Sequence, residues 1–317
     1  MDIKKFLFLI AGCIVGLLWV MASSSLLLSS ANDRENDQPI VIAVVKEMGI
    51  QEYDWAAAGF REILEKEKIT AKLEMIDRDG PNITARIKAL KPALILTMGS
   101  SATLSIADEI KEIPIIFSVV IDPRGSNVTS RNIIGAAVDI PVKRQLETLK
   151  SAFPGLKRLG VVYNPAENEA LVQEARTAAT ELGFNLNTYP VNSEIEIPKI
   201  EDLNIDLLWI IPDNMMCNPV ILKRILLSCL QNHVAVMGFT RHYARGGALL
   251  AVACDYEDIG RQSAEMAVKL LKGEKYSCLS ITAPRKVKLY LNKITADRLG
   301  ITIPDEIIRK ASEVFGQ

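Results

Sequence analysis

Small polar side chains stand within a few residues of the ends of several short apolar runs in this sequence. Ser100 and Ser101 follow the run 93–97, and Asp122 follows the run 115–119. Hydroxyl, amide and carboxylate groups gathered at one place can bind a polar, zwitterionic small molecule without covalent chemistry. The candidate binding residues are those that occupy such positions: Met48, Ser100, Ser101, Asp122, Asn164, Asp213, Asn214, Phe239 and Asp255.

The turn at Gly99, Ser100 and Ser101 carries the clearest physical argument. Ser100 is expected to be the N-cap of a helix, whose first backbone N–H groups have no partner inside the helix and carry a partial positive charge. With the two hydroxyls, these groups could receive a carboxylate without any arginine. The alternative is that both serines only cap the helix.

Each of the other candidates also has a purely structural interpretation. Asp213 and Asn214 could be helix-entry residues, and Asp255 could cap the helix that follows it. Asn164 stands before a proline, a pair that is typical of turns. An aromatic residue near a strand end, such as Phe239, usually belongs to the core. The residue types alone leave these alternatives open.

Patterns that support catalysis, metal binding or nucleic-acid binding are absent from the sequence. It contains no G-x-S-x-G, Walker A, G-x-G-x-x-G or H-E-x-x-H motif, and its two histidines are His233 and His242. No metal or cofactor is therefore expected, and an enzyme is not favoured. With 37 Lys and Arg against 38 Asp and Glu, the net charge is −1. The basic field that nucleic acid requires is excluded.

The first 31 residues predict export from the cytoplasm. Lys4 and Lys5 precede an apolar run over 6–21, and small residues at 29–31 offer a cleavage site. A retained membrane anchor over 6–28, or a lipoprotein attached at Cys13, are the alternatives. All three interpretations place the body of the protein outside the cytoplasm, after a polar linker over 32–39.

Four further cysteines stand in the body of the chain, at Cys217, Cys229, Cys254 and Cys278. Three of them, from Cys229 on, lie in or beside apolar runs, where a reduced cysteine packs as a small apolar side chain. An oxidising compartment would permit disulfides. The sequence favours buried thiols over disulfides.

Short β-branched runs alternate with amphipathic stretches along the body of the chain. Runs such as 40–45, 93–97 and 115–119 are typical of strands that are buried on both faces, and the stretches between them have helical spacing. This alternation is interrupted over 122–138 and then resumes. We therefore predict an α/β protein with two doubly wound parallel sheets, rather than one eight-fold barrel. Ligands of such sheets bind beyond the carboxyl ends of the strands, where the candidate residues stand.

Six segments of the sequence resemble one known family. They are 97–103 (TMGSSAT), 113–123 (IPIIFSVVIDP), 160–165 (GVVYNP), 212–214 (PDN), 255–264 (DYEDIGRQSA) and 299–304 (LGITIP). In this order they are similar to the ABC-transporter substrate-binding proteins of the tryptophan-binding-like group, which have a type I periplasmic-binding fold.

The resemblance implies two lobes joined by a three-strand hinge. The N-terminal lobe would comprise 40–139 with 255–283, and the C-terminal lobe 140–254 with 284–317. The lobes would close on a small, amino-acid-like and possibly aromatic ligand, which a monomeric protein would deliver to an ABC permease in the membrane. A ligand sensor for a membrane kinase or chemoreceptor is the first alternative, and a hydrolase with an unusual site is the second.

The resemblance also assigns roles to individual residues. Ser100 and Ser101 would hold a carboxylate, whereas Asp213, Asn214 and Asp255 would hold an ammonium group. The sequence departs from the family pattern at 46–52 and 239–243, where ligand specificity would be set. The ligand therefore does not follow from the family alone.

Overall fold

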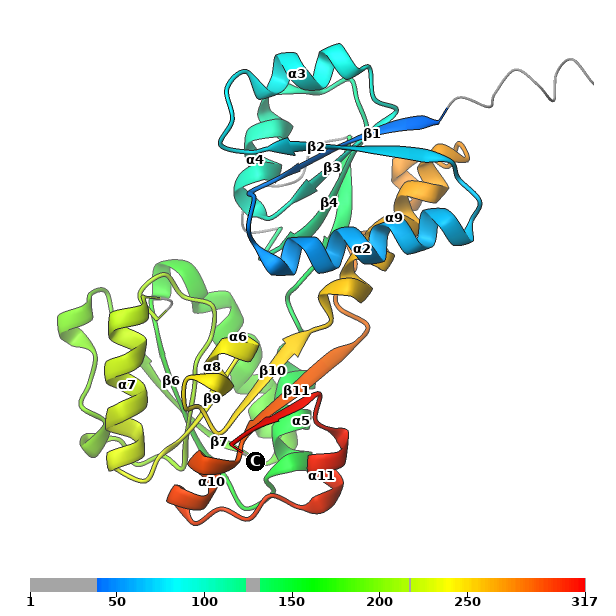
Figure 1. The fold of residues 1–317 in the computed structure, drawn as a ribbon. Coiled ribbons are helices and arrows are strands. Elements are labelled where there is room, and N and C mark those ends of the chain that lie inside the picture. The colour runs from blue at the N-terminus through cyan, green and yellow to red at the C-terminus, as the bar shows by residue number, and fades with distance from the viewer. Residues whose placement is uncertain (1–38, 124–131, 217, 317) are drawn as a thin grey trace, which may run out of the picture.

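The computed structural model describes residues 39–316 except for 124–131 and residue 217. It consists of two α/β lobes joined by extended crossings of the chain (Figure 1). The export signal predicted over 1–31, most of the linker and Cys217 lie outside the described residues. Of the helices that are described, none is long and apolar enough to span a bilayer.

The first lobe is built on a five-stranded sheet in the order β2-β1-β3-β4-β5, in which every pair of neighbours is parallel. Its strands are β1 (Ile40–Lys46), β2 (Ala71–Asp77), β3 (Leu94–Met98), β4 (Ile115–Val120) and β5 (Ile133–Ala137). Its helices are α2 (Gln51–Lys66), α3 (Ile83–Leu90), α4 (Ser100–Glu109) and, from late in the sequence, α9 (Tyr256–Leu271).

The alternating side chains of β1 explain why this sheet is covered on both faces. Ile42 and Val44 pack in one hydrophobic cluster with residues of α2 and α9. Ala43 and Val45 pack in another with residues of α3 and α4. Since successive strand residues point to opposite faces, an unbroken apolar run requires helices on both sides. The predicted doubly wound arrangement follows from this pattern.

The second lobe has a seven-stranded sheet in the order β12-β11-β10-β9-β8-β6-β7. The strands are β6 (Arg158–Tyr163), β7 (Asn185–Pro190), β8 (Leu207–Trp209), β9 (Ala235–Gly238), β10 (Leu250–Cys254), β11 (Val287–Asn292) and β12 (Glu313–Phe315). The helices are α5 (Val142–Ala152), α6 (Pro165–Leu182), α7 (Pro219–Gln231), α8 (Arg241–Arg245), α10 (Lys293–Leu299) and α11 (Asp305–Lys310). Only β10 and β11 pair antiparallel among these described strands.

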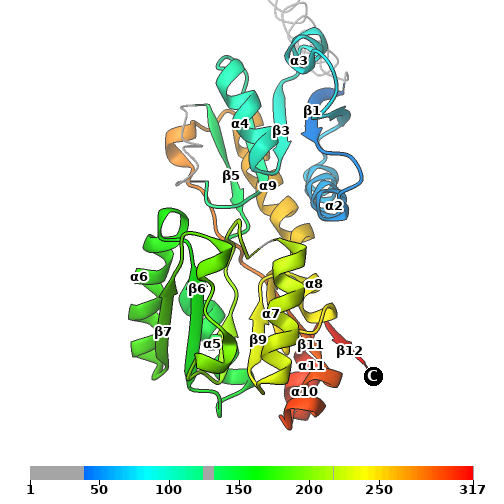
Figure 2. The same cartoon turned by 90° about the vertical axis from the view of Figure 1, so that its left-hand side faces the viewer.

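Three crossings connect the lobes, between β5 and α5, between β10 and α9, and between α9 and β11. Backbone pairing ties the third crossing to each of the other two where they leave the sheets. The Ala137 N–H donates to the Thr282 carbonyl at 2.9 Å, and Cys254 pairs with Val287. Figure 2 shows that the chain narrows at these crossings, with a sheet above and a sheet below.

The cysteine prediction is right for two of the three described thiols. Cys229, Cys254 and Cys278 are all free, and the first two are buried. Burial raises the pKa of the Cys229 and Cys254 thiols to about 12. Cys278, however, is exposed, because it lies in a short helical turn after α9 rather than within a strand or helix of the core.

Candidate functional site

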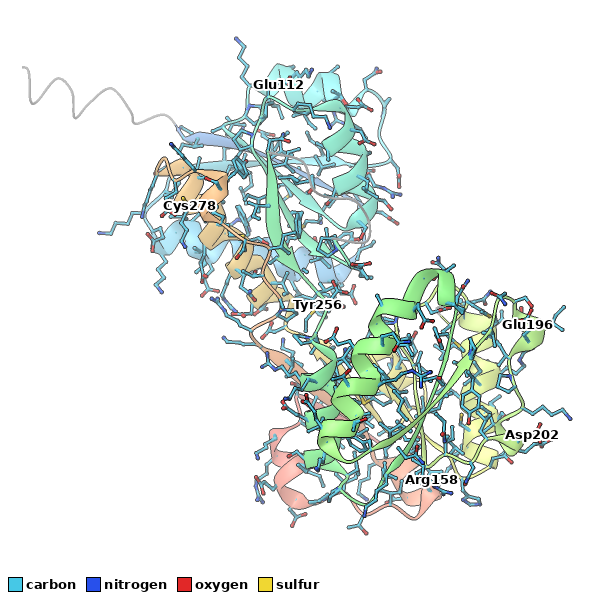
Figure 3. All side chains as sticks on the ribbon, turned by 180° about the vertical axis from the view of Figure 1, so that it is seen from behind. Glu112, Arg158, Glu196, Asp202, Tyr256 and Cys278 are labelled. Carbon is cyan, nitrogen blue, oxygen red and sulfur yellow. The ribbon has the colours of Figure 1, made fainter. Side chains whose placement is uncertain are left out.

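Adjoining cavities follow the junction between the lobes. The largest, about 640 Å³, is lined by Asp122 and Asp139 near the first lobe and by Glu167 and Leu171 of α6. A smaller cavity of about 110 Å³ shares Asp139 and Leu171 with it and is also lined by Phe239 and Tyr256. Because Ile121, Pro212 and these shared residues line both, the two cavities are parts of one cleft. Figure 3 shows Tyr256 at the level where the lobes meet.

Asp139 stands at the centre of this cleft, in the crossing between β5 and α5. Its Oδ2 accepts the Asp122 N–H at 2.7 Å. Burial raises the pKa of the Asp139 carboxyl to about 6; the N–H bond opposes the rise and the Asp122 charge adds to it. Within the described part of the chain, no lysine or arginine forms an ion pair with Asp139. A cationic group of a ligand would therefore find a carboxylate without a counter-ion.

The large cavity has an acidic lining around Asp139. Asp122, Glu167 and Glu174 also line it, and of the residues that the structure describes no lysine or arginine does. Among the described residues, no three acidic, histidine or cysteine side chains are grouped so that they could hold a metal ion. The arrangement suits an organic cation, such as an ammonium group.

Aromatic rings line the other side of the junction. Phe239 packs against Tyr243 with 4.7 Å between ring centroids, and Tyr256 lies 6.4 Å from Trp55 of α2. A further cavity of about 310 Å³ has Trp55, Tyr256 and Tyr290 in its lining. Charged side chains, Arg241, Glu257, Lys288 and Glu313, line it as well. Tyr256 lines both this cavity and the small one that Asp139 lines, so an aromatic ligand group could pack beside its ring.

The serine turn differs in detail from its prediction. Gly99, not Ser100, is the N-cap of α4, with a positive φ of 84°. The Ser100 hydroxyl accepts the Ile121 N–H at 3.3 Å and so joins the ends of β3 and β4. Ser101 is exposed in the first turn of the helix. Both serines stand at the carboxyl edge of the sheet, as predicted, but neither lines the three cavities.

Asp213 has a full set of partners inside its own lobe. Its Oδ2 accepts the Asn164 N–H at 2.8 Å and the Asn168 side-chain amide at 3.0 Å. Its Oδ1 accepts the N–H groups of Met215 and Met216 at 3.0 and 3.4 Å. The residue is only 3% exposed. The protein itself therefore satisfies this carboxylate, to which the resemblance assigned an ammonium group of the ligand.

Three more candidates have structural partners of their own. The Asn164 side chain caps α6 by accepting the Ala166 N–H at 3.0 Å. The Asn214 side chain donates to Glu167 at 3.1 Å. Asp255 caps α9 and lies 3.2 Å from the Lys288 ammonium. For Asp255 the structure shows the capping role that the sequence left as an alternative, and for Asn164 it shows a helix cap where the sequence offered a turn.

Of the nine candidates, two line the adjoining cavities, Asp122 and Phe239. Met48 is 53% exposed beyond the end of β1 and lines none of the three. The sequence analysis missed Asp139, Trp55 and Tyr256. Asp139 directly follows the run 133–138, so the rule that found the other candidates could have found it. The two aromatic residues lie inside helical patterns, and no local signal separates them from core residues.

Comparisons with known proteins agree with this architecture. The family model described as "ABC transporter substrate binding protein" matches residues 42–315. The chain is 23% identical over 268 residues to a tyrosine-binding protein of Clostridioides difficile (strain R20291), covering 78% of this chain and 76% of that protein.

Two solved structures share the fold. The ABC domain of Streptococcus pneumonia in complex with L-Trp is 22% identical, with a TM-score of 0.65 over 88% of this chain and all of that one. A ligand-free, open substrate-binding protein with adhesive properties from Clostridium difficile is 21% identical, with a TM-score of 0.74 over the same shares. The predicted α/β fold with two parallel sheets, of the type I periplasmic-binding class, is confirmed. With its family model matched over 42–315, this chain belongs to the ABC transporter substrate-binding protein family.

Proposed function

We propose that this protein binds an aromatic amino acid between its lobes, outside the cytoplasm, and delivers it to the permease of an ABC importer. The observation that carries the proposal is Asp139, a carboxylate that pairs with no cation of the described residues and lies in a cleft that aromatic rings also line. The tyrosine-binding relative and the tryptophan-bound structure support the same ligand class. The protein would act as a monomer and without chemical conversion of the ligand.

The ligand's ammonium group would pair with Asp139, and its ring would pack beside Phe239 and Tyr256. In the first lobe, the Ser100–Ser101 turn would bind the ligand carboxylate. A ligand that contacts both lobes has a higher affinity for the closed arrangement and so favours closure of the hinge. The predicted division into 40–139 with 255–283 and 140–254 with 284–317 would let the three crossings act as that hinge.

The proposal predicts that tyrosine, tryptophan or phenylalanine binds at pH 7.5 and that Asp139→Asn weakens this binding about 10- to 150-fold, the range for a lost charge-assisted bond. Affinity for the unmodified protein should fall as the pH drops below about 6, because a proton then competes with the ammonium group for Asp139. Calorimetric titration from pH 5 to pH 7.5 measures both effects. In Asp139→Asn the pH dependence should flatten.

Other titratable groups face Asp139, and their effect on the pH dependence of affinity must be distinguished from that of Asp139. They are Asp122 from the loop after β4, Glu167 and Glu174 from α6, Cys254 from β10 and Tyr256 from α9. The matched control is Asp108→Asn, an exposed carboxylate on α4, which should change neither affinity nor its pH dependence. The proposal fails if none of the three amino acids binds, or if Asp139→Asn stays within twofold of the unmodified protein.

A stability measurement shows that Asp139→Asn does not act by unfolding. The pKa of Asp139 is raised from 3.8 to about 6, so between these values the folded state binds more protons than the unfolded state. The contribution of Asp139 to the free energy of unfolding therefore falls as the pH rises from about 4 to 6. At pH 7.5 the ligand-free Asp139→Asn protein should be at least as stable as the unmodified protein in a urea titration.

A further inference from the structure

Helix α7 carries apolar side chains on its outer surface as well as on its inner one. Ile221, Ile225 and Cys229 are buried against the core of the second lobe. On the outside, Val220 is 77% exposed and Leu227 is 53% exposed. A surface helix normally presents polar residues on its outer face, and one that is apolar all round is normally buried. Lys223 and Arg224 are exposed on the same helix. The exposed surface of α7 therefore combines apolar and basic side chains, a composition that suits contact with an acidic amphipathic partner.

A groove runs beside α7, toward the end of α8 and the start of α10. Its volume is about 500 Å³, and Leu222, Leu226 and Leu230 line it at intervals of four residues, one helical face. Ile294 of α10, itself 49% exposed, lines the groove on the far side. Figure 2 shows α7, α8 and α10 on the same side of the second lobe, with α10 at the end remote from the first lobe. This α7–α10 groove is separate from the cleft between the lobes.

The polar groups of the groove floor are already satisfied within the protein. The Asn292 side-chain amide donates to the Ala244 carbonyl at 2.8 Å, and its oxygen accepts the Thr295 N–H at 2.9 Å. The Thr295 hydroxyl donates to the Gly247 carbonyl at 3.0 Å. What the groove offers to a partner is therefore apolar surface, together with its charges.

Those charges are all positive. Lys223, Arg245 and Arg298 line the groove, and no carboxylate of the described residues does. Among the described residues, none of these three cations takes part in a salt bridge. Arg245 and Arg298 stand in the last turns of α8 and α10, where helix carbonyls favour a cation. Lys223 is in the middle of α7 and has no such neighbour.

We infer that the α7–α10 groove binds an acidic amphipathic helix of a partner protein. A ridge of apolar side chains at helical spacing would fill the hollow, and flanking carboxylates would meet the three cations. A flat bilayer surface would leave a hollow of about 500 Å³ unfilled. A small anion would leave the apolar lining of the groove, and Val220 beside it, exposed. The inference does not depend on the ligand of the cleft.

The test uses a fluorescein-labelled synthetic 18-residue helix with leucines at i, i+4, i+7 and i+11 and glutamates on both flanks. Fluorescence anisotropy with the full chain should show saturable binding in the micromolar range, which weakens as salt is added. The double variant Lys223→Glu with Arg298→Glu should lower the affinity about tenfold or more. The same peptide with lysine in place of every glutamate should not bind.

The matched control is the double variant Lys66→Glu with Lys269→Glu, which reverses two last-turn cations of the first lobe. It should leave peptide affinity unchanged. Leu227→Ser tests the apolar contribution to peptide binding. The fold should tolerate this substitution because the position is exposed, and the variant should bind the peptide more weakly. The inference is overturned if the anisotropy of the labelled peptide does not rise with protein at 100 times the peptide concentration, or if both double variants weaken binding equally. Binding to phosphatidylglycerol vesicles without binding to the peptide would assign the groove to a membrane surface instead.

Discussion

Carboxylates at the strand ends of this protein divide according to their partners. Asp213 accepts four N–H groups inside its own lobe, whereas Asp139 accepts one backbone N–H and faces a cavity. A carboxylate whose lone pairs are occupied holds its loop in place, and one with free lone pairs can receive a ligand. Both residues are aspartates in the sequence. Only their surroundings distinguish the carboxylate that holds a loop from the one that can receive a ligand.

Asp213→Asn should destabilise the second lobe by about 3 kcal/mol, because an amide NH₂ would face N–H donors and a buried charge-assisted network would be lost. Ligand affinity should change little, since Asp213 lines none of the cleft cavities. Urea denaturation measures the first effect and calorimetry the second. Asp202→Asn, at an exposed position of the same lobe (Figure 3), should be neutral in both. A tenfold loss of affinity with unchanged stability would instead make Asp213 a ligand residue.

At the scale of elements, the first lobe depends on close packing between α2 and α9, which lie far apart in the sequence. Two glycines permit it. A Cβ added at Gly59 would lie 1.9 Å from the Glu257 carbonyl oxygen, and one added at Gly260 would lie 1.9 Å from the Ala56 carbonyl oxygen. Both obstacles are backbone atoms, which cannot move aside as a flexible side chain could. The helices therefore approach at a distance that only glycine allows.

Gly59→Ala should destabilise the protein by about 2 kcal/mol or more, although alanine is about 1 kcal/mol better than glycine inside a helix. The steric clash outweighs the gain in helix propensity, so the free energy of unfolding should fall. Gly155→Ala is the control, because an added Cβ there meets no atom within 4 Å. The midpoint of thermal or urea unfolding should be lower for Gly59→Ala and nearly unchanged for Gly155→Ala. Equal shifts would mean that the helices can separate without loss.

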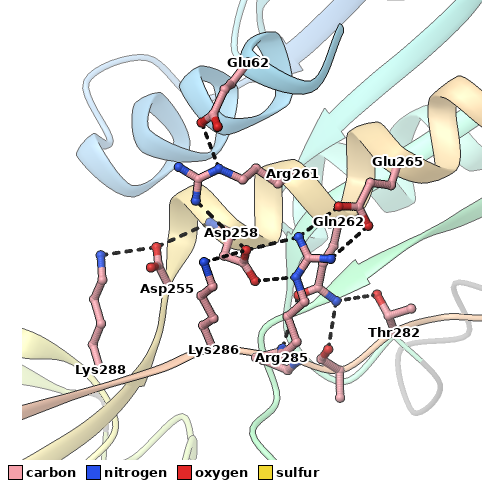
Figure 4. A network of polar contacts seen from close by, with 12 residues as sticks. Glu62, Asp255, Asp258, Arg261, Gln262, Glu265, Thr282, Arg285, Lys286 and Lys288 are labelled. Carbon is pink, nitrogen blue, oxygen red and sulfur yellow. Dashed lines mark hydrogen bonds and ion pairs between the residues drawn. The ribbon is translucent and has the colours of Figure 1, made fainter. Parts of the chain in front are cut away.

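At the scale of the whole molecule, a charged network fastens the last crossing to α9 (Figure 4). The Arg285 guanidinium donates to Asp258 at 2.9 and 3.1 Å and to Glu265 at 2.9 Å. Its hydrogen bonds to Glu265 and Asp258 raise the pKa of Arg285. The Asp258 side chain is 2% exposed, so its charge requires this partner. The crossing is thereby fixed to the first lobe just before it enters the second.

Arg285→Ala should destabilise the protein by about 2–3 kcal/mol, because it leaves the buried Asp258 carboxylate with fewer cationic partners. Lys272→Ala removes an exposed ion pair with Glu67 on the same lobe and should cost much less, because solvent screens that pair. Chemical denaturation of both variants at pH 7 compares them directly. If the two losses are the same, the network in Figure 4 contributes no more than an ordinary surface pair.

The sequence by itself determined the fold class. Apolar runs such as 40–45 must be covered on both faces, and amphipathic stretches of helical period must supply the cover, so two doubly wound sheets follow from local patterns. The pattern also located the carboxyl ends of the strands, where Ser100, Asp122 and Phe239 lie. It did not predict α5, β11 or β12, because β12 is short and the other two carry polar residues among their apolar ones.

Only the tertiary structure decided which polar residues face the cleft. Asp213 is bound by Asn164 and Asn168, which are 49 and 45 residues away in the sequence, and Asp139 is brought beside Phe239 and Tyr256 by the crossings. Whether a carboxylate is satisfied depends on donors that arrive from distant elements, and no local pattern contains them. For the same reason the outer face of α7 could not be distinguished from its core face before the helices were in place.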